Sequence, residues 1–218
     1  MMDANKLAQM MEGSTYLFLV CNFLMGLYNV ILVQLRLRKL RFRREAQQIE
    51  FLDAILAHLK AGEYAEIEEF CEGDQRALSQ LALATVSNRT MGYEQLKQYV
   101  TELLQRDVFG DIESRVSWIA TVIRSGPLWG LFGTVLGMMA AFGEIGSGAK
   151  VEAHTIAERI AVALICTAMG LATAIPYGYL LCGINIKVRQ LQDGVTSGVM
   201  RILDHFKPVK QKSHGVRV

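Results

Sequence analysis

The sequence predicts an all-α integral membrane protein with three transmembrane helices and helical cytoplasmic extensions. Hydrophobic residues make up 51% of the 218 residues, and charged residues only 20%. The charges concentrate between about residues 36 and 115 and again after residue 186, which leaves three long blocks almost free of charge. No long segment alternates between apolar and polar residues as a half-buried strand would. The expected environment is therefore the lipid bilayer, and the net charge of +2 indicates no nucleic-acid partner.

The first predicted span covers residues 15–35, an apolar run of about 20 residues that suffices to cross a bilayer core. A cleavable signal peptide would have a shorter apolar core preceded by positive charge, so we expect this run to stay as an anchor. An interfacial lipid anchor would have the same orientation. By the positive-inside rule the end of the run faces the cytoplasm, and residues 1–14 form a periplasmic or interfacial segment. Six basic residues in nine positions support this: Arg36, Arg38, Lys39, Arg41, Arg43 and Arg44.

Residues 36–115 are predicted to form a helical cytoplasmic domain. Apolar residues from Ile49 to Leu59 recur at spacings of three and four, which is typical of an amphipathic helix. Gly62 and Gly73 interrupt this pattern. We interpret the glutamates between these glycines as a solvated face. They are Glu63, Glu66, Glu68, Glu69 and Glu72.

Two further spans are predicted at residues 117–146 and 156–186, with a short periplasmic loop at 147–155 between them. Each span contains a proline, which neighbouring helices can accommodate in a membrane. Residues 187–218 form a basic cytoplasmic tail. Three crossings from an outside N-terminus end inside the cell, and the basic tail agrees with that topology.

Small residues follow one face of each later span at steps of three and four. The first stripe is Gly126, Gly130, Thr134, Gly137 and Ala141, and the second is Ala163, Thr167, Gly170, Ala174 and Gly178. One interpretation is close helix packing, with each threonine bonded to a carbonyl of its own helix. The other is a pair of weakly polar faces that line a narrow channel, where the two hydroxyls solvate an ion.

Neither an enzyme nor a cofactor site is predicted. The four cysteines form no CxxC pair, and the four histidines have no ligand at a suitable spacing, so we expect no metal site. The cysteines are interpreted as small packing residues. The run GLFGTVLG matches no phosphate-binding motif and lies in an apolar block. No arrangement of nucleophile and base, and no pair of carboxylates, indicates catalysis.

Two long motifs resemble the ExbB/TolQ/MotA family. They are WIATVIRSGPLWGLFGTVLGMMAAF and IAERIAVALICTAMGLATAIPYGYLLCGIN, and together they cover about residues 117–186. Three spans are similar to the layout of ExbB and TolQ, whereas the flagellar subunit MotA has four.

This resemblance implies an energy-transducing channel subunit in the bacterial inner membrane. Family members form homopentamers around a single-span partner of the ExbD/TolR/MotB type, whose membrane aspartate binds and releases the permeating ion. The ion is H⁺ or Na⁺, and its flow is coupled to mechanical work on the cell envelope. The family's pore threonines correspond to Thr134 and Thr167. A structural scaffold without conduction is the alternative, and a signalling or permease component is a weaker third interpretation.

One position departs from the family pattern. ExbB and TolQ carry a glutamate five residues before the threonine of the last span, and Val162 occupies that place here. Glu158 lies one turn earlier on the same face as Val162 and is a possible auxiliary carboxylate. The alternative is an interfacial carboxylate beside Arg159. The choice between H⁺ and Na⁺ therefore stays open.

Overall fold

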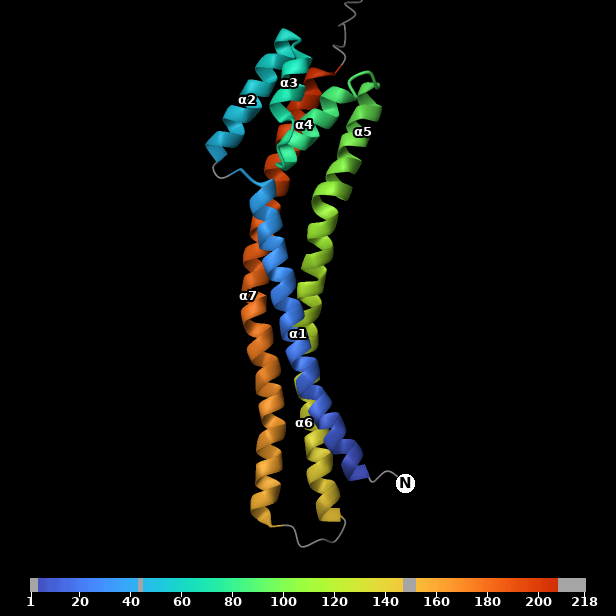
Figure 1. Ribbon diagram of the computed structural model, residues 1–218, viewed down its shortest axis with the longest axis vertical. Coiled ribbons are helices and arrows are strands. Elements are labelled where there is room, and N and C mark those ends of the chain that lie inside the picture. Colours follow the sequence, from blue (N-terminus) through green and yellow to red (C-terminus); the bar gives the residue numbers. More distant parts are fainter. Residues whose placement is uncertain (1–3, 43–44, 147–151, 208–218) are drawn as a thin grey trace, which may run out of the picture. The chain divides into compact units, whose positions relative to one another are not determined.

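The computed structural model describes residues 4–42, 45–146 and 152–207, which contain helices and no strand. Three helices are long and apolar enough to cross a membrane: α1 (Ala4–Leu40), α6 (Gly110–Gly146) and α7 (Ala153–His205) (Figure 1). The mean hydropathies of their most apolar windows are 2.0, 1.3 and 1.9. The predicted all-α fold with three spanning helices is confirmed, whereas the orientation of the termini stays a prediction.

Contacts divide the chain into two compact units, and the long helices contribute to both. The spanning unit contains the chain up to Gln34 and from Glu113 to Asn185. The head unit contains residues from Leu35 to Ile112 and from Ile186 onward.

The long helices extend past the limits expected for the spans. Helix α1 begins at Ala4, inside the segment predicted to precede the first span. A π-helical segment, Leu104–Phe109, leads directly into α6. Helix α7 continues to His205, so much of the predicted tail at 187–218 is helical. Of the predicted loop at 147–155, residues 147–151 lie outside the described residues. Helix length does not mark a bilayer boundary, so the limits of the spans stay predictions.

Close contacts hold α1 against the other two helices of the spanning unit. A Cβ atom on Gly26 would lie 2.9 Å from both the Tyr177 ring and a Val122 methyl group, so any larger residue would force these side chains to shift. The Tyr177 hydroxyl donates to the Phe23 carbonyl over 2.8 Å, and the Asn22 amide donates to the Ser125 hydroxyl over 2.6 Å. Helix α1 is thereby bonded to both α6 and α7.

Large apolar side chains cover the outside of the spanning unit. Only 28 to 39% of each apolar window is buried. Residues such as Leu128, Met139 and Leu164 are 64, 64 and 58% exposed. Monomeric soluble proteins rarely expose contiguous apolar surface of this extent, and hydrocarbon is its natural surrounding.

The head unit gathers four short helices around the C-terminal part of α7 (Figure 1). They are α2 (Glu45–Ala61), α3 (Tyr64–Cys71), α4 (Ala77–Ser87) and α5 (Tyr93–Leu103). Gly62 and Gly73 each have a φ of 78°, which only glycine adopts without strain, so α2 and α3 end where the sequence predicted interruptions. The core is fully buried at Ile55, Leu59, Ile67, Leu81 and Ile202.

The four cysteines are free. Cys71 and Cys166 are buried, as expected of packing residues, whereas Cys21 and Cys182 are exposed on the spanning unit. Burial of Cys71 raises the pKa of its thiol; a hydrogen bond with Ser79 opposes the rise and the Asp74 charge adds to it. The thiolate is the reactive form, so a raised pKa lowers the reactive fraction at any given pH.

We therefore expect Cys71 to resist alkylation by iodoacetamide in the folded protein at mildly alkaline pH, and to react after unfolding in detergent. Quantification of the Cys71 peptide by mass spectrometry measures this. Equal labelling rates in the folded and unfolded protein would show that Cys71 is accessible and readily ionised.

Candidate functional site

The two small-residue stripes face each other inside the spanning unit. A Cβ atom on Gly170 would lie 2.5 Å from the Gly126 carbonyl oxygen, and one on Gly130 would lie 2.8 Å from the Cys166 carbonyl oxygen. These neighbours are backbone atoms, so a side chain could fit only if the helices moved apart. The glycines allow α6 and α7 to touch backbone to backbone.

The other small residues of the two stripes differ in how far they are buried between α6 and α7. Gly137, Ala141, Ala163 and Ala174 are buried. Gly178 is only half-buried, and a Cβ atom there would meet nothing within 4 Å. The close contact therefore does not include the last residue of the predicted stripe.

Thr134 and Thr167 meet beside the close contact at Gly130. Their hydroxyl groups are hydrogen-bonded to each other. The Thr134 hydroxyl also lies 3.0 Å from the Ala163 carbonyl oxygen and 3.2 Å from that of Gly130. The Thr167 hydroxyl lies 3.1 Å from the same Gly130 oxygen. We call these two hydroxyl and two carbonyl oxygens the oxygen cluster.

The oxygen cluster has more acceptor capacity than protons. Two hydroxyl groups supply two protons, while two hydroxyl and two carbonyl oxygens supply lone pairs. Both threonines are half-buried, and neither cluster helix places a fixed charge among these atoms. Such a neutral set of oxygens can solvate a cation or a water molecule without a buried ionised side chain.

Helix α1 places residues near the oxygen cluster that the sequence did not predict to lie there. A Cβ atom on Gly133 would lie 2.9 Å from the Thr15 methyl carbon and 3.0 Å from Cys166 Cβ, so three helices converge one residue from Thr134. Thr15 is 1% exposed. The sequence did not predict a role for Asn22 either. An asparagine within an apolar span could have indicated a helix contact, because a polar side chain in hydrocarbon needs a hydrogen-bond partner.

The structure does not bring Glu158 to the threonines. Glu158 is exposed and precedes Thr167 by nine residues, which is about two and a half turns and about 13.5 Å along α7. It therefore lies on the opposite side of the helix. Val162, at the position of the family's glutamate, accepts a hydrogen bond at its carbonyl from the Tyr16 hydroxyl over 3.4 Å.

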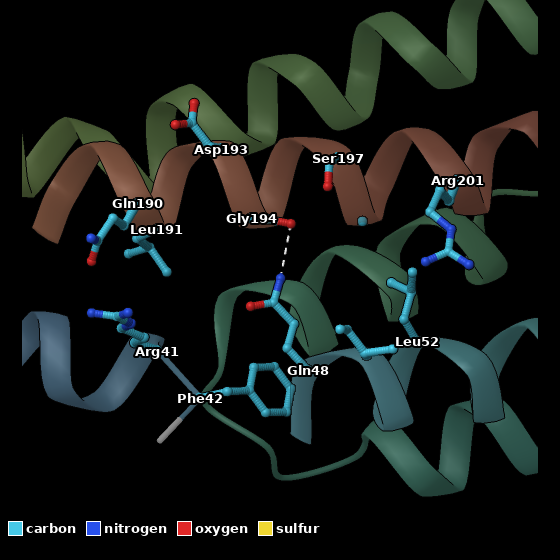
Figure 2. A pocket seen from close by; sticks show the side chains of 12 residues that line it. Arg41, Phe42, Gln48, Leu52, Gln190, Leu191, Asp193, Gly194, Ser197 and Arg201 are labelled. Atoms are coloured by element: carbon cyan, nitrogen blue, oxygen red, sulfur yellow. Dashed lines mark hydrogen bonds between the residues drawn. The ribbon is translucent and has the colours of Figure 1, made fainter. Parts of the chain in front are cut away.

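The head unit contains a groove of about 500 Å³ between the start of α2 and the C-terminal part of α7 (Figure 2). The Gln48 amide reaches across it and donates to the Gly194 carbonyl over 2.9 Å. Arg41 and Arg201 contribute positive charge to its lining, and Arg201 pairs with Asp53 over 3.3 Å. The Gln48 hydrogen bond therefore bridges the two sides of the groove.

The family model of the MotA/TolQ/ExbB proton channel family matches residues 74–196, which is more than half of the chain. The chain belongs to this family. The match contains α4, α5, all of α6 and most of α7, and therefore the whole oxygen cluster.

Individual proteins similar to this chain carry the names ExbB and TolQ, in agreement with the family match. The chain is 35% identical over 105 residues to the putative biopolymer transport protein ExbB-like 2 of Helicobacter pylori, covering 48% of this chain and 65% of that protein. It is 46% identical over 65 residues to the Tol-Pal system protein TolQ of Haemophilus influenzae, covering 30% and 28%. It is 26% identical over 190 residues to the biopolymer transport protein ExbB of Pseudomonas putida, covering 84% and 54%. The matches thus span less than two thirds of these relatives.

Proposed function

We propose that this chain is the ion-conducting subunit of an ion-driven motor of the bacterial inner membrane, and that the oxygen cluster solvates the permeating ion. The proposal rests on the contact of both threonine hydroxyls with the Gly130 and Ala163 carbonyls. This contact lies within the residues that match the proton channel family model. The permeating ion is H⁺ or Na⁺.

The energetics are compatible with this role. Carbonyl and hydroxyl oxygens replace part of the ion's hydration shell, so the ion need not meet a buried fixed charge. One elementary charge that crosses 100 mV delivers about 2.3 kcal/mol. A few ions per cycle therefore supply enough free energy for a conformational step.

Neither α6 nor α7 carries an acidic residue within two turns of its threonine. The sequence has no Asp or Glu at residues 116–143 or 159–186. We propose that a single-span partner of the ExbD/TolR/MotB type supplies a membrane aspartate, and that several copies of this chain, five by resemblance, surround it. The chain would then provide the solvating oxygens and the partner the titratable group.

Ion flux through vesicles that contain the chain with its cognate partner tests the assignment. Thr134→Val and Thr167→Val keep the side-chain shape and remove one hydroxyl each. Loss of a hydrogen bond to a charged species costs about 1.5–3 kcal/mol, so we expect flux to fall roughly tenfold or more in each variant. Replacing Na⁺ by another cation at constant pH identifies the ion.

Thr173→Val is the matched control. Thr173 is buried on α7, the helix of Thr167, and its hydroxyl donates to the Met169 carbonyl of that helix over 3.0 Å. Its flux should stay at the wild-type level. Unchanged flux and motor output in both cluster variants would overturn the pore assignment.

The structural scaffold remains the second candidate because the contact of Gly126 with Gly170 is by itself a packing device. It predicts that the cluster variants lose thermal stability and that the wild-type chain conducts nothing. A genome without a short single-span protein that carries a membrane aspartate would also favour it.

A further inference from the structure

The turn between α2 and α3 brings three potential metal ligands together. The His58 Nδ1 atom lies 3.0 Å from Glu63 Oε2 and 3.1 Å from Glu66 Oε2. The three ligand atoms all lie within 4.8 Å of one another. The sequence predicted no metal site because these residues are five and eight positions apart, and neither is the spacing of three or four at which side chains of one helix meet.

Glycine at position 62 produces this arrangement. Its φ of 78° reverses the chain, and the Glu63 amide donates to the His58 carbonyl over 3.0 Å. His58 in the last turn of α2 therefore faces Glu66 in the first turn of α3, with Glu63 between them. The whole cluster belongs to one helix pair in the head unit.

Two carboxylates lie beside one imidazole nitrogen in this cluster. A single imidazole Nδ1 atom can donate one proton, yet two carboxylate oxygens lie within hydrogen-bond distance of it. Among the described residues no lysine or arginine pairs with Glu63 or Glu66. The nearby Arg89 instead pairs with Glu68 over 3.6 Å and lies over the Tyr64 ring. A divalent cation would neutralise the two carboxylates.

We propose that His58, Glu63 and Glu66 bind a divalent transition-metal ion, for which Zn²⁺ is the natural probe. Zn²⁺ binds imidazole nitrogen at about 2.0–2.1 Å and carboxylate oxygen at about 2.0–2.2 Å. In tetrahedral geometry these bonds place the ligand atoms roughly 3.3–3.5 Å apart. The two distances from His58 Nδ1 therefore need to lengthen only by a few tenths of an ångström. The side chains are 36, 49 and 60% exposed, which leaves the fourth position to water and an open entry path.

The bound ion would link the end of α2 to the start of α3. Binding through Nδ1 leaves Nε2 to carry the imidazole proton toward solvent. This proposal does not depend on ion conduction by the spanning unit.

Isothermal titration of the purified full-length protein with Zn²⁺ tests the site, and the absorption spectrum of bound Co²⁺ reports its geometry. We expect one ion per chain and a tetrahedral Co²⁺ spectrum. His58→Asn and Glu66→Gln should each weaken binding at least tenfold, since even the loss of outer partners typically costs about 10–100-fold.

Glu69→Gln is the matched control, because it removes the same charge from an exposed position of α3 outside the cluster. Its affinity should equal that of the wild type. Circular dichroism of each variant shows whether the helices are retained. Equal Zn²⁺ affinity in the wild type and His58→Asn would overturn the site and leave only an ion pair at these residues. An equal loss of affinity in Glu66→Gln and Glu69→Gln would also overturn it, because it would indicate a general electrostatic attraction.

Discussion

Gly170→Ala is expected to destabilise the spanning unit by about 1–3 kcal/mol, the usual range for overpacking a closely packed interior. The added methyl group would lie 2.5 Å from the Gly126 carbonyl oxygen. That neighbour is helical backbone and cannot rotate away, so α6 and α7 must separate. Alanine is intrinsically better than glycine inside a helix by about 1 kcal/mol, and the steric conflict has to exceed that gain.

Thermal unfolding of the purified protein in detergent measures the effect, and ion flux in vesicles shows whether the oxygen cluster survives the separation. Gly178→Ala is the control on the same helix, since a Cβ atom there meets nothing within 4 Å. We expect it to be neutral or slightly stabilising. Equal melting temperatures for the two variants would contradict the close contact between the helices.

Ile55→Ala should destabilise the head unit by about 2–5 kcal/mol. Ile55 is 0% exposed, so the substitution removes buried apolar contacts and leaves a cavity among α2, α3 and the other helices of this unit. The same substitution at Ile49, on the same helix but 56% exposed, should change the stability by no more than about 0.5 kcal/mol.

Amide hydrogen exchange in the full-length protein, read from peptides of α2–α4, compares these two variants. A loss of 2 kcal/mol or more corresponds to exchange faster by roughly thirtyfold or more if the unit opens cooperatively. Exchange that is equally fast in Ile55→Ala and Ile49→Ala would mean that α2 does not pack through Ile55.

Local patterns predicted much of this structure because hydropathy and spacing are readable within one segment. The three spanning helices follow from three blocks almost free of charge, and the interruptions at Gly62 and Gly73 follow from breaks in the apolar period. Thr134 and Thr167 were selected because each lies on a face of small residues. Whether the two faces meet could not be read from either segment alone.

Other features needed contacts between distant residues. Helix α7 does not end with its apolar block but continues to His205 and packs in the head unit, where a Cβ atom on Gly198 would lie 2.7 Å from a Leu78 methyl group. The sequence pattern offers Glu158 as a substitute for the missing glutamate, yet its position on α7 places it half a turn away from the side of Thr167. The contribution of Thr15 beside Gly133 also appears only when three helices are assembled.

Composition and periodicity within single helices predict the class of the protein, the number of spanning helices and the two faces that carry Thr134 and Thr167. The shared Gly130 carbonyl, and the two glutamates that His58 meets across a turn, are seen only in the folded chain. Hydrogen bonds and steric contacts act over a few ångströms in space. Residues become neighbours at that range only after helices pack or a glycine reverses the chain.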